Sequence, residues 1–219
     1  IERFGRSPSY VVSCAGVAPA GALLTSPVKM FTRAFDINAA ANVVLAQAFL
    51  PAMISNNHGH FMTVASSASY FSLPNLCAYS MSKTAALAFL ESLRAELRAV
   101  YKACRVRTSV VTPTKVRTVL AEGLNEGDDD FLMPVLEPIQ VARAMADTLN
   151  SGLSRNISLP LGSALLPYLR ALPEWYRGAL RAMGNTDALV TPESISRGQQ
   201  ALRGHQSNLD HLKKLGVHS

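Results

Sequence analysis

The fold of this chain is decided by the stretch from Phe61 to Lys83, which reads FMTVASSASYFSLPNLCAYSMSK. It opens with a short apolar run, Phe61 to Ala65, which is typical of a buried strand. Ser66 follows where that strand would end, and a helix rich in alanine and leucine is predicted over residues 77–101. Because open α/β sheets carry their chemistry at the carboxyl ends of strands, the stretch predicts a functional site around Ser66.

Tyr79 and Lys83 have the spacing of neighbours on one face of this helix. An unperturbed phenol has a pKa of about 10, and a positive charge beside it favours the phenolate. The spacing therefore predicts that Lys83 lowers the pKa of Tyr79 toward neutral pH, where the phenol can give or take a proton. The alternative on spacing alone is a surface tyrosine beside a solvated lysine.

The rest of the chain alternates between strand and helix signals. Strands are predicted at residues 9–14, 60–65, 106–111 and 155–159, and helices at 27–55, 77–101 and 137–151, the first of them bent at Pro51. Strands joined by helical crossovers form a parallel sheet with its functional groups along one edge. The predicted fold class is therefore α/β.

Several segments resemble the short-chain dehydrogenase/reductase family in that family's own order, from about residue 9 to about 160. They are the Tyr79–Lys83 segment with Ser66, the run Phe35 to Asn38, the segment Pro113 to Thr118, and the strand Tyr10 to Val17. The match is incomplete, since Thr114 replaces a glycine and Ser13 and Cys14 replace two asparagines. The amino-acid sequence from Ala65 to Lys83 most resembles that of the branch that oxidises or reduces retinoids, steroids and other lipophilic alcohols and ketones.

The resemblance implies a role for each matching residue. Tyr79 would exchange a proton with substrate, Lys83 would also bind the nicotinamide ribose, Ser66 would hydrogen-bond the substrate oxygen, and Asn38 would hold a proton-relaying water. Ser67 is the alternative to Ser66. The residues implied to contact the cofactor are Ala15, Gly16, Tyr79, Lys83, Pro113, Val116 and Thr118.

The family's glycine-rich pyrophosphate turn and its ribose-reading residue have no counterpart in this sequence. We therefore expect the first strands of the Rossmann-like, doubly wound sheet to be missing, and the isolated chain to be inactive. The expected organisation is the carboxyl-terminal portion of a catalytic domain over 1–160, an amphipathic helical extension over 161–183, and a polar, loosely ordered tail over 184–219. The cofactor is NAD or NADP, and these residues do not decide which.

Composition supports a globular domain rather than a nucleic-acid-binding one. The chain of 219 residues is 48% hydrophobic and 16% charged, and its net charge of +6 comes from basic residues scattered between Arg3 and Lys214. Cys14, Cys77 and Cys104 have no metal-ligand spacing and are expected to be reduced. His58 and His60 are expected in a solvated turn, and no metal site is predicted.

In the extension, leucine and aromatic residues recur every three or four positions over 161–183, with arginines on another face. Pro167 and Pro173 are expected to break the helix. Trp175 and Tyr176 at its centre favour either peripheral contact with an intracellular membrane or packing over the substrate cleft or a partner subunit.

The predicted function is hydride transfer between a nicotinamide cofactor and a lipophilic alcohol or ketone, in a cytoplasmic protein that is peripheral on a membrane at most. The resemblance implies a homo-oligomer paired through the helices near 38–55 and 79–101. One alternative is a catalytically silent binding or assembly protein, which the replacements Ser13 and Cys14 favour. An epimerase or dehydratase using the same tyrosine and lysine is another.

Overall fold

The computed structural model describes residues 7–121, 134–183, 190, 191, 193, 195 and 196. Their strands form one parallel sheet in the order β1-β2-β3-β4. The strands span Tyr10–Ser13, Gly59–Val64, Val106–Pro113 and Asn156–Leu159. All lie where the sequence predicts a strand, and the α/β prediction is confirmed.

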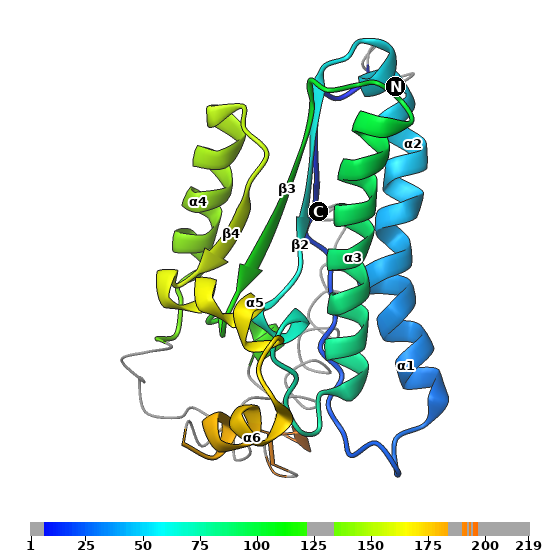
Figure 1. The fold of residues 1–219 in the computed structure, drawn as a ribbon. Coiled ribbons are helices and arrows are strands. Elements are labelled where there is room, and N and C mark those ends of the chain that lie inside the picture. The colour runs from blue at the N-terminus through cyan, green and yellow to red at the C-terminus, as the bar shows by residue number, and fades with distance from the viewer. Residues whose placement is uncertain (1–6, 122–133, 184–189, 192, 194, 197–219) are drawn as a thin grey trace, which may run out of the picture.

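Helices cover both faces of the sheet (Figure 1). The helices α2 (Ala41–Ser55) and α3 (Cys77–Ala99) lie on one face, and α4 (Pro138–Ser151) lies on the other. The core fills the space between the sheet and the pair α2 and α3, where the Phe61 and Phe89 rings meet edge to face at 6.1 Å. Its members include Val11, Leu50, Met53, Phe61, Leu87, Leu90 and Val110. Burying one such side chain contributes about 1.5–3 kcal/mol to stability.

The predicted helix at 27–55 is divided in the structure. It consists of α1 (Val28–Phe35), a π-helical turn η1 (Asp36–Ala40) and α2. The break therefore comes at η1, whereas α2 continues through Pro51. The side chain of Asn42 contacts this turn, since its Nδ2 donates to the carbonyls of Asn38 at 2.8 Å and Ala39 at 3.2 Å. A side chain thus bonds carbonyls within the irregular turn.

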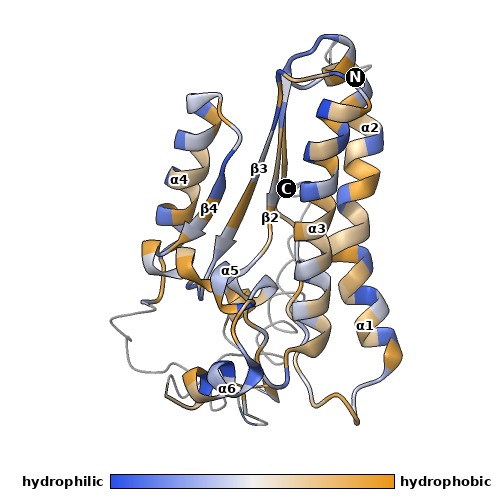
Figure 2. Ribbon diagram, viewed as in Figure 1, coloured by the Kyte–Doolittle hydropathy of each residue, from blue (hydrophilic) through white to orange (hydrophobic). Residues whose placement is uncertain are grey.

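Residues Val28–Ser55 are apolar and long enough to cross a membrane by length and composition. Figure 2 shows hydrophobic colouring along most of α2. In this fold, however, Ala46, Leu50 and Met53 of α2 are buried in the core. A core helix meets the same criteria, and one face of α2 packs in the core while Val43 and Val44 on another face are 42% and 65% exposed.

The strand β1 forms an edge of the sheet in the described part of the chain, as the sequence predicts. Tyr10 and Val12 point to its less covered side and are 56% and 39% exposed. The expectation that the neighbouring His60 lies in a solvated turn was wrong. It lies within β2, is 2% exposed, and its Nε2 is 2.9 Å from Ser109 Oγ.

The extension forms the short turn η4 (Leu161–Leu165), the single helical turn α5 (Leu166–Leu169) and the helix α6 (Glu174–Met183). The predicted break at Pro173 is confirmed, since a gap at residues 170–173 precedes α6, whereas Pro167 lies within the first turn of α5. The predicted tail over 184–219 lies mostly outside the described residues. Within it, Val190 is buried, and its carbonyl accepts a hydrogen bond of 2.8 Å from Asn75 Nδ2.

Candidate active site

Tyr79 lies in the first turn of α3, close to the carboxyl end of β2. Ser66 follows β2 by two residues and caps the short 3-10 turn Ser67–Ser69, where its Oγ accepts from Ala68 N at 3.1 Å. Ser66 is 6% exposed, and its side chain lies close enough to Tyr79 to oppose the rise in the pKa of the Tyr79 hydroxyl. The strand and the helix thus bring together the two residues that stand thirteen positions apart.

Burial sets the protonation state of Tyr79. Loss of solvent raises the pKa of its hydroxyl above the ordinary value of 10.0, and the Ser66 side chain only partly opposes this. The expected net lowering of the Tyr79 pKa toward neutral pH was therefore wrong. The Lys83 ammonium lies 6.0 Å from the centre of the Tyr79 ring, and desolvation of the phenolate is the dominant effect. Tyr79 therefore holds its proton at neutral pH.

Lys83 is 3% exposed, and its Nζ donates a 2.8 Å hydrogen bond to the carbonyl of Val64 at the end of β2. Burial lowers the pKa of its ammonium to about 8, while the nearby Cys14 acts in the opposite direction. At pH 7 the side chain still carries its charge. The bond to Val64 fixes α3 against the sheet at the level of Tyr79.

Gly16 allows the backbone after β1 to pass close to both Lys83 and Asn38. A Cβ atom at this position would lie 3.2 Å from Lys83 Nζ and 3.1 Å from Asn38 Oδ1. Such contacts are tighter than ordinary van der Waals packing, so a side chain here would displace one of the two groups. The predicted cofactor residue Gly16 thus adjoins two of the predicted catalytic residues. The adjacent Ala15 is exposed.

Asn38 is 2% exposed and all its side-chain donors are used. Its Nδ2 donates to Val17 O and to Ser82 Oγ, each at 2.8 Å, and its Oδ1 accepts from Val17 N at 2.8 Å. Ser82 Oγ in turn donates to the carbonyl of Tyr79 at 2.8 Å. Asn38 therefore links the loop after β1 to the helix that carries Tyr79 and Lys83.

Three residues of this network were not assigned a role from the sequence: Val17, Ser82 and Asn42. Asn42 Oδ1 accepts a 3.0 Å bond from Thr63 Oγ1, which connects the π-helical turn to β2. Asn42 is the single strongly polar residue between Ala39 and Ala46, and a buried amide in such a run is the signal that the sequence offered. Ser82 lies inside the Tyr79–Lys83 motif, but the motif alone does not give it a partner.

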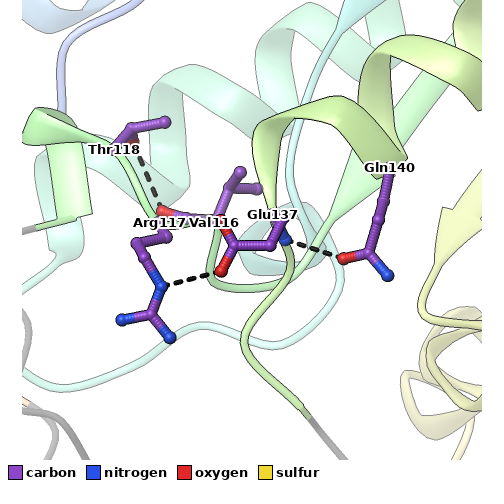
Figure 3. Close-up of polar contacts among 5 residues, drawn as sticks. All are labelled: Val116, Arg117, Thr118, Glu137 and Gln140. Atoms are coloured by element: carbon purple, nitrogen blue, oxygen red, sulfur yellow. Dashed lines mark hydrogen bonds and ion pairs between the residues drawn. The ribbon is translucent and has the colours of Figure 1, made fainter.

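The segment Pro113 to Thr118 leaves the carboxyl end of β3 and is attached to the start of α4 (Figure 3). Val116 forms a parallel bridge with Leu136. Arg117 Nε bonds Glu137 Oε1 at 2.8 Å, and Glu137 N donates to Gln140 Oε1 at 2.7 Å in the capping box of α4. Thr118 Oγ1 donates to Val116 O at 3.3 Å.

Among residues 7–121 and 134–183, no group of three His, Cys, Asp or Glu side chains is placed to hold a metal ion. Cys14 and Cys104 are exposed and Cys77 is partly buried, and all are free thiols. Tyr79 and Lys83 lie near the carboxyl edge of the parallel sheet, which is where such folds bind substrates.

A family model described as short chain dehydrogenase matches residues 8–129. The chain is 37% identical over 175 residues to human estradiol 17-beta-dehydrogenase 11, covering 79% of this chain and 56% of the relative. It is 35% identical over 141 residues to mouse epidermal retinol dehydrogenase 2, covering 64% of this chain and 45% of the relative. The chain thus spans about half the length of the curated relatives it matches.

Solved structures share the fold. A gluconate 5-dehydrogenase from Burkholderia cenocepacia, in complex with NADP and tartrate, superimposes with a TM-score of 0.64 at 17% identity, over 74% of this chain and 67% of the other. An acetoin dehydrogenase from Salmonella typhimurium gives a TM-score of 0.62 at 19% identity, over 75% of this chain and 68% of the other. At these identities the likeness concerns the fold alone.

Proposed function

The chain belongs to the short-chain dehydrogenase family, and from this membership we propose that it supplies the catalytic half of an oxidoreductase site. The proposed reaction is reversible hydride transfer between a nicotinamide dinucleotide and a hydroxyl or carbonyl group. The observation that carries the proposal is the meeting of Ser66, Tyr79 and Lys83 at the end of β2. Activity is proposed for the complete protein, and the isolated chain is expected to be inactive.

Tyr79 is proposed as the proton donor in the reductive direction. Because burial raises its pKa, the hydroxyl is protonated at neutral pH and can donate to a carbonyl oxygen of the substrate. Ser66 donates a second hydrogen bond to the same oxygen, on which negative charge develops. Ser66 is favoured over Ser67 for this role because it is the serine that acts on the pKa of Tyr79.

Lys83 acts through its charge. Its ammonium, held near the Tyr79 ring by Val64, stabilises the phenolate that remains after proton transfer. Lys83 then gives a proton to this phenolate, and Asn38 is proposed to hold the water through which a proton from solvent returns to Lys83. Both Nδ2 hydrogens of Asn38 already have partners, so such a water would have to donate to an oxygen of this residue.

The cofactor supplies or accepts the hydride, and it is NAD or NADP. The close approach of the backbone at Gly16, where a side chain would collide with Lys83 and Asn38, fits a surface kept clear beside a bound ligand. The residues proposed to hold it are Ala15, Gly16, Tyr79, Lys83, Pro113, Val116 and Thr118. Lys83 would bond its ribose, and the Pro113 to Thr118 segment would position its nicotinamide ring.

The proposed substrate is a lipophilic alcohol or ketone of retinoid, steroid or similar type. The names of the relatives, an estradiol dehydrogenase and a retinol dehydrogenase, support this class. We also propose a homo-oligomer, and a cytoplasmic location with peripheral contact to an intracellular membrane through residues 161–183. The exposed aromatic side chains Tyr168 and Trp175 support the membrane contact.

A catalytically silent binding protein is the competing proposal. The exposed Cys14 just after β1, which replaces an asparagine of the family pattern, favours it. Retention of Asn38, Ser66, Tyr79 and Lys83 in one connected arrangement disfavours it. An epimerase or dehydratase would use the same tyrosine and lysine, and product analysis distinguishes it from net oxidation.

The decisive experiment compares Tyr79→Phe with the wild-type complete protein, following nicotinamide absorbance with retinol and estradiol. Loss of turnover, with an unchanged circular dichroism spectrum, is expected. Ser66→Ala and Ser67→Ala form a matched pair: the first should lose about 100-fold or more in kcat, by analogy with removal of an oxyanion donor, and the second should retain activity. A wild-type protein with no turnover on any alcohol or ketone would support the silent alternative.

A further inference from the structure

Two exposed apolar groups lie at the same end of the molecule as the candidate active site. The first is the loop before α1, with Leu23 58%, Leu24 96% and Val28 77% exposed. The second belongs to α5 and α6, with Tyr168 73%, Trp175 75% and Met183 83% exposed. In Figure 1 this loop and α6 both lie at the lower end, toward which the strands point. These six residues are termed the apolar rim.

The segment from Tyr70 to Leu76 connects the two groups. On one side, Gly21 N in the loop donates to Asn75 O at 2.8 Å. On the other, the Arg181 guanidinium of α6 lies 5.0 Å from the centre of the Phe71 ring, and its Nε bonds Ser72 O at 3.4 Å. Tyr79 stands three residues after this segment, so both groups are joined to the chain just before the helix turn that carries the proposed catalytic tyrosine.

The loop has the form of a small protruding turn. The amides of Thr25 and Ser26 both bond the carbonyl of Ala22, at 3.2 and 3.0 Å, and this turn holds Leu23 and Leu24 outward. Figure 2 shows hydrophobic colouring in this loop. A protruding pair of leucines is poorly suited to cover a sheet or helix of its own chain, but it can enter the boundary between lipid headgroups and acyl chains.

The charge around the rim is positive. Residues 17–35 contain Lys29 and Arg33 and no acidic residue, and Lys29 immediately follows Val28. Residues 160–183 contain three arginines and a single acid, Glu174, which is ion-paired with Arg177 and with Arg181. Basic side chains beside leucine, tyrosine and tryptophan match an anionic lipid surface, which attracts the charges and accepts the apolar groups.

We propose that the apolar rim docks the protein on an anionic lipid surface, with the loop Leu23 to Val28 and helix α6 as two contact points joined through the Tyr70 to Leu76 segment. The benefit of this docking rests on the proposed function, since the end of the molecule that carries the proposed catalytic residues would then face the phase in which lipophilic alcohols are dissolved. It adds the loop before α1 to the contact proposed for residues 161–183, and it fixes which end of the molecule faces the lipid.

The single tryptophan of the chain, Trp175, lies within the rim and reports on its environment. The experiment mixes the chain with vesicles of phosphatidylcholine, with and without phosphatidylserine, and with brominated phosphatidylcholine. We expect co-sedimentation with the anionic vesicles, a blue shift of Trp175 emission and quenching by the brominated lipid, all weakened by salt.

The variant Leu23→Ser with Leu24→Ser tests the loop without altering Trp175. Its matched control is Val43→Ser with Val44→Ser, which removes two exposed apolar side chains of α2, 42% and 65% exposed, away from the rim. The loop variant should bind anionic vesicles several-fold more weakly, and the control should bind as the wild type does. Circular dichroism confirms that both remain folded.

Other outcomes would overturn the proposal. These are the absence of vesicle binding, equal loss in the control variant, or co-sedimentation without quenching of Trp175. A blue shift that grows with protein concentration in lipid-free buffer would instead assign the rim to contacts between copies of the chain. Tyr79→Phe should bind vesicles normally, so failure of the lipid proposal and failure of the proposed reaction are distinguishable.

Discussion

The side chain of Asn38 holds Ser82 by a hydrogen bond of 2.8 Å from Nδ2 to Oγ, between residues forty-four positions apart. Ser82 Oγ in turn donates a hydrogen bond to the carbonyl of Tyr79. The same Asn38 amide group bonds both the N–H and the carbonyl of Val17. One buried side chain thus sets the distance between the loop after β1 and the helix that carries the proposed proton donor.

Ser82→Ala should destabilise the protein by about 1–3 kcal/mol, because one Asn38 N–H is then buried without an acceptor. Urea unfolding measures this loss. Ser92→Ala is the matched control, since Ser92 is exposed on the same helix and its replacement should change stability by less than about 0.5 kcal/mol. Equal stability of the two variants would show that Asn38 finds another acceptor.

Gly16→Ala should displace Lys83 or Asn38, because the new Cβ would lie 3.2 Å and 3.1 Å from their polar atoms. A cost of about 1–3 kcal/mol is expected from the overpacking, with reduced turnover in the complete protein. Gly178→Ala is the control, because a Cβ there meets no atom within 4 Å. Unchanged activity of Gly16→Ala would mean that the loop moves aside without consequence.

Asn42 and Thr63 should be energetically coupled. Asn42→Leu leaves the Thr63 hydroxyl and two carbonyls of the π-helical turn without this partner, so we expect a loss of about 1–3 kcal/mol. Thr63→Val alone removes one hydrogen bond. In a double-mutant cycle measured by chemical denaturation, the double mutant should lose less stability than the sum of the two single losses. Strict additivity would show that the 3.0 Å bond between them contributes nothing.

Lys83 should make stability depend on pH in a defined window. Its pKa is about 8 in the folded protein against 10.5 for the free side chain, so the unfolded chain binds more protons between these values. Stability therefore rises with pH across that interval, as the cost of burying the charge is removed. Wild type should gain stability relative to Lys83→Met from pH 8 to pH 10. A constant difference over this range would refute the lowered pKa.

Much of the fold can be predicted from local sequence patterns. The apolar runs that become β2 and β3 and the alternation with helices were sufficient to predict a parallel sheet, because burial on both faces leaves a continuous apolar signal. The pairing of Ser66 with Tyr79 followed from a family motif, and the structure brings these two side chains together. The roles assigned to the site residues stay predictions.

Other features depend on neighbours that a single sequence does not reveal. The direction of the Tyr79 pKa shift is set by how deeply the phenol is buried, and the spacing to Lys83 carries no information about burial. His60 looked like a loop residue beside Gly59, but its ring is sheltered by the sheet and bonded to Ser109. The Asn42 side chain bonds carbonyls of the irregular turn at Asp36–Ala40 and also accepts a hydrogen bond from Thr63, and the sequence does not reveal that Thr63 is its neighbour.

The π-helical turn has a geometric consequence for deletions and insertions in this chain. A π turn accommodates one residue more than the α-helix it interrupts, and one residue corresponds to a rotation of about 100° around the helix axis. Deleting a single residue within Asp36–Ala40 would therefore favour one uninterrupted α-helix whose two halves keep about the same relative rotation. The π-helical turn thus absorbs one extra residue while Asn38 still meets Ser82 and Asn42, four residues later, still meets Thr63.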